Sequence, residues 1–145
     1  MNYLIDTNVL SEPRCKKPDP RVVAWLQTNT SHIYTSVLVL GEIRYGIEIL
    51  PANSARKAEM LKWHKELVGV LAGRVLSINA RVVEEWAKLQ AETYLKRRVL
   101  PVIDSLLAAT ARRYQLTLAT DNVKDFVDIG LKLFNPFDQD KADQV

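Results

Sequence analysis

The sequence has few of the residues that build disulfide scaffolds, zinc sites and nucleotide loops. Its 145 residues include one cysteine, two histidines and five glycines. The lone Cys15 excludes an internal disulfide, and His32 and His64 are too far apart in sequence to form a familiar zinc motif. There is no glycine-rich phosphate loop, Walker motif or nucleophile elbow. No apolar run has the length of a signal peptide or membrane span, so we expect a cytoplasmic protein that does not bind membranes.

Charge is balanced rather than extreme. The chain has 20 Lys and Arg against 17 Asp and Glu, a net charge of +3. This excess permits a polyanionic partner without requiring one. The basic residues gather in four short groups: Lys16-Lys17, Arg56-Lys57, Lys96-Arg97-Arg98 and Arg112-Arg113. A solvated helix face explains each group taken alone more often than a binding surface does.

Short runs of β-forming residues alternate with longer stretches of helical periodicity. The strands are predicted at 3–5, 33–36, 75–78 and 116–119, with a fifth at 132–134; the helices are predicted at 19–28, 37–50, 54–71, from the cap at Asn79 to 98, and from the break at Leu100-Pro101 to about 114, with a short one at 122–127. This alternation predicts an α/β fold with a central parallel sheet of four to five strands and helices on both faces. We expect one domain over residues 1–137 and a polar tail over 138–145.

The first predicted strand ends abruptly in Asp6-Thr7-Asn8. In open parallel sheets, ligands bind beyond the carboxyl ends of the strands, near the switch in strand order. Asp6 stands at such an end. Taken alone, an acid at this position is more often the N-cap of the following helical turn, so the other acids must decide between the two interpretations.

Two further acids have apolar helical neighbours. Glu42 lies three and four residues from Leu38 and Tyr45, which predicts a carboxylate in an apolar stripe. Such a group needs a partner, a proton or a metal, unless it is a rim glutamate that reaches water. Asp104 has Leu107 on the same helix face. The first helical turn favours an acid by roughly 0.3–1 kcal/mol, but this does not explain its apolar neighbours.

The fourth predicted strand ends like the first, in Thr120-Asp121-Asn122, with Asp125 close behind. Thr120 or Asp121 alone is adequately explained as a helix cap. Several acids brought together would repel unless a cation lay between them, and ligands that are all oxygen favour Mg²⁺ or Mn²⁺. A cluster of this kind activates water and neutralises phosphate oxygens during in-line displacement, so phosphodiester hydrolysis is the leading hypothesis. A phosphatase with Asp6 as nucleophile is an alternative, although the usual Asp-x-Asp pattern is missing.

Five segments, LIDTNVLSE, VLVLGEIRYGI, VIDSLLAATA, LATDNVKDF and LFNPF, resemble PIN-domain ribonucleases in order and spacing over residues 2–137. The likeness is strongest to the VapC toxins of type II toxin–antitoxin systems, in particular their FitB-like branch. The resemblance implies a three-layer α/β/α PIN-like fold and a Mg²⁺- or Mn²⁺-dependent endoribonuclease, with tRNA or another structured RNA as substrate. It also implies a homodimer held inactive by an antitoxin with a DNA-binding domain.

The family's site residues can be carried over position by position. Asp6 and Asp104 correspond to the principal metal ligands and Glu42 completes the acidic set, while Thr7 and Asn8 orient Asp6 or solvent. Water activated by the metal would then attack phosphorus and leave 5′-phosphate and 3′-hydroxyl ends.

The fourth acidic corner departs from the family pattern. The family often has Thr-Arg-Asn or Thr-Arg-Asp at this strand exit, whereas this sequence has Asp121 in place of the arginine. Either Asp121 takes the fourth metal-binding corner, or Asn122 holds it with Asp125 behind it through water. The departure also motivates an alternative function, a catalytically weak PIN scaffold that acts mainly by binding its antitoxin and supporting repression of operator DNA.

Large apolar side chains on the predicted helices suggest a core and a contact surface. Trp25, Tyr45, Trp63 and Trp86 are each interpreted as plain core residues. The long helix at 54–71 is predicted to supply antitoxin or dimer contacts.

Overall fold

The computed structural model describes residues 1–139 and contains one parallel sheet of five strands in the order β3-β2-β1-β4-β5. The strands are β1 (Tyr3–Ile5), β2 (Ile33–Ser36), β3 (Val75–Leu76), β4 (Thr117–Ala119) and β5 (Leu133–Phe134). In the register, β1 pairs with both β2 and β4, so that Leu4 lies opposite Tyr34 on one side and Leu118 on the other. The predicted parallel sheet is confirmed, with β3 two residues shorter than expected.

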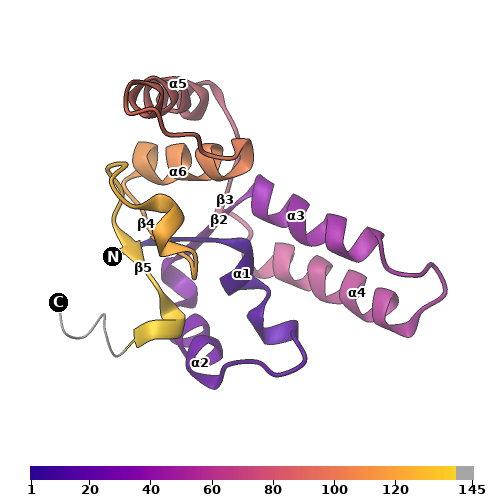
Figure 1. Cartoon of the computed structure of the whole chain (residues 1–145). Helices are drawn as coiled ribbons and strands as arrows, with labels where there is room; N and C mark the ends of the chain where they lie inside the picture. The colour runs from indigo at the N-terminus through magenta and orange to yellow at the C-terminus, as the bar shows by residue number, and fades with distance from the viewer. Residues whose placement is uncertain (140–145) are drawn as a thin grey trace.

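Helices cover both faces of this sheet, which confirms the α/β/α prediction. They are α1 (Thr7–Leu10), α2 (Pro20–Thr28), α3 (Val37–Glu48), α4 (Ala55–Val70), α5 (Ala80–Leu95) and α6 (Val102–Tyr114), with 3-10 helices η1 (Glu12–Arg14), η2 (Thr30–His32), η3 (Val123–Phe126) and η4 (Pro136–Asp138). Figure 1 shows α5 and α6 stacked at the top, α2 at the bottom, and α3 and α4 projecting together as a pair to the right. The short helix predicted at 122–127 is the 3-10 helix η3.

Helix starts follow the capping residues in the sequence. The side chains of Asp19, Ser36, Ser54 and Asn79 each accept a hydrogen bond from a backbone N–H in the first turn of α2, α3, α4 and α5 respectively. Small polar side chains at these positions satisfy N–H groups that the helix itself leaves unpaired. The local signals therefore place the helix starts to within a residue.

The described chain continues past the predicted domain boundary at residue 137. The helix η4 includes Asp138, and the side-chain amide of Gln139 donates to the carbonyl oxygens of Arg21, at 3.2 Å, and Pro136, at 2.8 Å. These contacts attach the segment to the start of α2. The rest of the predicted tail, 140–145, lies outside the described residues.

The core fills both faces of the sheet, and one predicted core residue lies outside it. The ring of Trp25 packs against Tyr3, with centroids 4.9 Å apart, and Phe134, at 5.2 Å. Trp63 and Trp86 are half-buried against the core. Tyr45, however, is 68% exposed, so its assignment to the core is wrong. The buried stripe of α3 consists of Val39, Leu40, Ile43 and Ile47, and Tyr45 lies on the opposite side of the helix.

An ion-pair network joins α5 to α6. The Arg112 guanidinium, whose side chain is 14% exposed, donates to Glu85 at 3.0 Å and to both carboxylate oxygens of Glu92 at 2.7 and 3.0 Å. Its hydrogen bonds with Arg112 lower the pKa of Glu92. Arg112 is therefore a structural residue, whereas its neighbour Arg113 is exposed. No helix in residues 1–139 has the length and apolarity to cross a membrane.

We predict that Arg112→Met lowers the free energy of unfolding by roughly 2 kcal/mol, because it leaves Glu85 and Glu92 without their charged donor. Thermal unfolding should show a decrease in Tm of roughly 4–8 °C. Because the pKa of Glu92 is depressed in the folded state, this loss should shrink as the pH falls through the titration range of that carboxylate. Arg113→Met is the matched control, and equal Tm values for the two variants would contradict the structural role.

Candidate functional site

The site lies where the strand order reverses. From β1 the chain moves outward through β2 to β3, then returns to the other side of β1 with β4 and β5. The carboxyl ends of β1 and β4 are therefore adjacent, and the backbone N–H of Asp6 donates to the carbonyl oxygen of Ala119 at 3.0 Å. Asp6 and Thr120, the residues that follow these two strands, meet at the position where open parallel sheets bind ligands.

Asp6 is both a helix cap and the buried acid of this edge. Asp6 is only 6% exposed, and its Oδ1 accepts a hydrogen bond from the N–H of Thr7 at 2.8 Å. The other oxygen, Oδ2, accepts from the Thr120 hydroxyl at 2.8 Å and the Asn8 amide at 3.2 Å. The two interpretations left open by the sequence are thus compatible, because different oxygens serve the cap and the contact with β4.

Glu42 reaches this edge from α3. Its Oε1 accepts a hydrogen bond from the Thr7 hydroxyl at 2.8 Å, which joins α3 to the first turn of α1. The prediction that Glu42 lies in an apolar stripe is wrong: Glu42 is exposed, and the buried stripe runs along another side of the helix. The interpretation as a rim glutamate describes its burial correctly, and Thr7 gives it a fixed partner.

Asp104 is the acid on which the other charges act most clearly. It lies half-buried in the first turn of α6, as predicted, with Leu107 and Ala108 fully buried on the following turn. Burial raises the pKa of Asp104, and the negative charges of Asp6, Asp125 and Glu42 raise it further. Four carboxylates from four different segments therefore share one electrostatic environment.

The polar residues that follow β4 have different hydrogen-bond partners. The N–H of Asp121 donates to the Asn8 side-chain oxygen at 3.1 Å, and the N–H of Asn122 donates to the Thr120 hydroxyl at 3.0 Å. Desolvation and the charges of Asp6 and then Glu12 raise the pKa of Asp121. Asp121 thus shares Asp6 as a charged neighbour with Asp104, whose pKa Asp125 also raises.

Two of these roles were weakly signalled by the sequence. Thr120 was considered only as a helix cap, yet its hydroxyl donates to Asp6 and accepts from Asn122. Asp125 was placed behind Asn122, yet its charge acts directly on Asp104. Spacing along the chain offers little help in either case, because each role depends on a partner more than 20 residues away.

The donor set suits a hard divalent cation. The residues at this edge offer carboxylate oxygens that repel one another, while His64 contacts the carbonyl of Leu40 and His32 contacts Asn2. Within residues 1–139, no three Asp, Glu, His or Cys side chains stand close enough together to hold a metal ion as they are oriented. Asp6 is fixed by its hydrogen bonds, so binding would require rotation of the exposed Glu42 and Asp125 side chains.

Comparison with known proteins identifies the family to which this fold belongs. The family model of the PIN domain matches residues 3–131. The chain belongs to the PIN-domain family. It is 30% identical to Toxin FitB of Neisseria gonorrhoeae over 135 residues, which cover 92% of this chain and 97% of that protein. It is 31% identical to VapC ribonuclease Y4jK of Sinorhizobium fredii over 136 residues, with coverages of 93% and 97%.

Solved structures give the same result for the fold. The crystal structure of FitAcB from Neisseria gonorrhoeae matches with a TM-score of 0.87 at 30% identity, covering 94% of this chain and 99% of that one. A structure of FitAB bound to a DNA fragment matches with a TM-score of 0.86 at 29% identity, covering 93% and 95%. The PIN domain described here therefore shares its whole architecture with these proteins.

The acidic site of this PIN domain should make the metal-free protein less stable than a neutral variant. We predict that Asp104→Asn raises Tm at pH 7 without metal, because it removes a half-buried charge that three acids repel. Each kcal/mol of relieved repulsion should add roughly 2–4 °C. The difference should vanish at low pH, since a raised pKa penalises the folded state only while Asp104 is ionised.

The same unfolding measurement with Mg²⁺ or Mn²⁺ tests the metal. Added cation should raise the Tm of the wild type and have little effect on Asp104→Asn. Glu48→Gln is the control, since Glu48 is exposed and paired with Arg44. A wild-type Tm that exceeds that of Asp104→Asn without metal would contradict the repulsion.

Proposed function

We propose that this PIN domain is a metal-dependent endoribonuclease and the toxin component of a type II toxin–antitoxin system. The observation that carries the proposal is the set of mutually repelling carboxylates at the carboxyl ends of β1 and β4. Two relatives bear the names VapC ribonuclease and Toxin FitB, and they match this chain over more than nine-tenths of its length. The proposed location is the cytoplasm, where such an enzyme would meet RNA.

Asp6, Asp104, Glu42 and Asp125 would hold a Mg²⁺ or Mn²⁺ ion. Bound there, the cation would lower the pKa of water and neutralise phosphate oxygens during displacement at phosphorus. We choose Asp125 over Asp121 for the fourth position because the charge of Asp125, like those of Asp6 and Glu42, raises the pKa of Asp104, whereas Asp6 and Glu12 raise the pKa of Asp121. Asp121 would then add negative potential at the rim of the site.

The remaining polar residues would hold these carboxylates in place. Thr7 and Asn8, with Thr120 from β4, fix the orientation of Asp6. Thr7 also occupies Oε1 of Glu42, whereas Oε2 has no hydrogen-bond partner among residues 1–139. That oxygen is available to bind the cation or to accept a proton from the attacking water. Asn122 shapes the strand exit through its N–H and takes no proton in this scheme.

RNA cleavage tests the proposal. Purified protein should cut a mixed pool of structured RNA, tRNA included, with Mg²⁺ or Mn²⁺ and not with EDTA, and should leave 5′-phosphate ends. Asp6→Asn and Asp104→Asn should each lower the rate by at least about 100-fold, because each removes charge from the metal-binding set.

Two controls keep this test specific. Glu42→Gln should lose activity, whereas Glu48→Gln on the same helix should cut RNA like the wild type. Products with 2′,3′-cyclic phosphate would contradict attack by water. A folded wild type that cuts no RNA with either metal would favour the scaffold function instead.

We also propose an antitoxin partner with a DNA-binding domain, bound along α4. The FitAB structure was solved bound to a DNA fragment and the Rickettsia felis VapBC2 structure bound to a fragment of their promoter, and one relative of this chain is named Toxin FitB. In this chain, α4 has no fully buried residue, and an apolar groove of about 160 Å³ lies between α4, α2 and α1. The groove is lined in part by Leu10, Leu26, Trp63, Leu67 and Val70.

Exposed apolar residues at the α5–α6 connection, Leu95 and Val99 among them, suit a homodimer contact.

The groove can be tested without disturbing the core. Val70 lines it and is 58% exposed, while Val68, on the same helix and 39% exposed, does not line it. We predict that Val70→Asp prevents co-purification with the co-expressed antitoxin, whereas Val68→Asp and Asp6→Asn do not, since they leave the groove intact. Equal loss of binding in the two valine variants would contradict docking in this groove.

A further inference from the structure

Side chains at the end of α5 donate hydrogen bonds to the backbone of the segment that carries Asp125. We propose that Arg98 is a positioning residue that holds Asp125 at the acidic site by binding the backbone of residues 125–127. The inference rests on the proposed function in one respect, since it takes Asp125 as one of the site carboxylates. It concerns a residue that the sequence grouped only with a basic cluster.

The contacts of Arg98 are directed at backbone carbonyls. Its Nη2 donates to the carbonyl oxygen of Asp125 at 2.7 Å, and its Nη1 donates to that of Val127. Beside it, the Lys96 ammonium donates to the carbonyl oxygen of Asp128 at 3.3 Å. Three side-chain contacts thus connect the residues just after α5 to a segment 27 to 32 residues further along the chain.

The backbone conformation at the end of α5 directs the Arg98 side chain toward this segment. The N–H of Arg98 donates to the carbonyl of Thr93 at 2.8 Å and the N–H of Arg97 to that of Tyr94 at 3.0 Å, the paired bonds of a Schellman motif. Arg97 takes the left-handed position of this motif, with φ of 55°, where glycine is usual. Asp128 is also left-handed, with φ of 62°. Non-glycine residues in this conformation need support from surrounding contacts, and here both flank the Arg98 contact.

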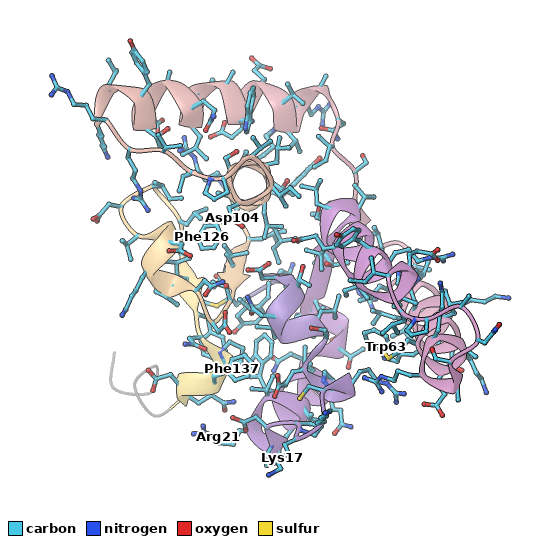
Figure 2. The ribbon with its side chains drawn as sticks, turned by 45° about the vertical axis from the view of Figure 1, so that its right-hand side comes forward. Lys17, Arg21, Trp63, Asp104, Phe126 and Phe137 are labelled. Carbon is cyan, nitrogen blue, oxygen red and sulfur yellow. The ribbon has the colours of Figure 1, made fainter. Side chains whose placement is uncertain are left out.

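On its other side, the segment is tied to Asp6. The N–H of Asp125 donates to the carbonyl of Asn122 at 3.0 Å, the N–H of Asn122 donates to the Thr120 hydroxyl at 3.0 Å, and that hydroxyl donates to Asp6 at 2.8 Å. Phe126, 1% exposed, anchors η3 in the core, and in the view of Figure 2 it lies below the end-on helix α6 that carries Asp104. Arg98 and Thr120 therefore hold the Asp125 backbone from opposite ends.

The Arg98 guanidinium binds backbone carbonyls and does not neutralise the site carboxylates. In the part of the chain that the structure describes, the Asp125 carboxylate accepts no hydrogen bond, so it stays available to a cation or to water. The three side-chain charges that raise the pKa of Asp104 are all carboxylates, from Asp6, Asp125 and Glu42. A planar guanidinium suits this task because its two terminal nitrogens reach two carbonyls at once, which a lysine ammonium does not do in the same fixed geometry.

Mn²⁺ binding to the purified full chain, measured by calorimetry, is the primary test, with RNA cleavage as a second readout. We expect Arg98→Met to weaken Mn²⁺ binding about 10- to 100-fold and to lower kcat similarly while KM for RNA changes little. Arg98→Lys should recover part of the loss. Arg97→Met is the matched control, because it removes the same charge from an exposed neighbour that, within residues 1–139, hydrogen-bonds only through its backbone.

A double-mutant cycle separates positioning from general stability. If Arg98 acts through Asp125, adding Arg98→Met to Asp125→Asn should weaken Mn²⁺ binding no further. Additive losses, equal effects of Arg97→Met and Arg98→Met, or unchanged binding by a folded Arg98→Met would each overturn the inference. If the wild type binds Mn²⁺ but cuts no RNA, the proposed nuclease function is refuted. The Mn²⁺-binding measurements alone then decide whether Arg98 positions Asp125. A wild type that binds no Mn²⁺ would overturn both.

Discussion

The structure depends on the satisfaction of one buried charge. The Asp6 carboxylate leaves water at the end of β1, and a buried carboxylate is costly unless donors surround it. Its donors come from the first turn of α1 and from Thr120 after β4, so satisfying the charge also fixes how these two strand exits meet. The same hydrogen bonds begin a helix, join two strands and orient a site carboxylate.

The other acids add a cost that the fold must carry. Asp104 is half-buried among three negative neighbours, an arrangement that opposes folding when no cation is present. The opposing stabilisation comes from elsewhere, including the buried stripe of α6 and the Arg112 network that holds α5 against it. A strained acidic edge on a well-packed scaffold is the arrangement expected where a site is organised in advance for a charged ligand.

Local signals in the sequence were sufficient for the strands, the capped helix starts and the strand exits at Asp6 and Thr120, because each depends on a few adjacent residues. The face of α3 was predicted wrongly, since four-residue spacing shows which side chains are neighbours but not which side of the helix meets the core. Glu42 and Tyr45 are exposed for that reason. The position of Asp125 depends on Arg98 and Asn122, and the contact with Arg98 spans 27 residues, a distance at which spacing carries no information.

Asp121, at the position where the family resemblance leads us to expect arginine, contributes a negative charge and a backbone hydrogen bond to the site. The contact that Asp121 makes with Asn8 uses its backbone N–H, which any side chain but proline would provide. Its carboxylate instead adds a negative charge near Asp6 and Glu12, which strengthens the demand for a cation at this edge. Because Arg98 donates its hydrogen bonds to backbone carbonyls, no arginine within the described site offsets this negative charge. If a cation binds at this edge as proposed, Asp121 increases the negative charge that the cation balances.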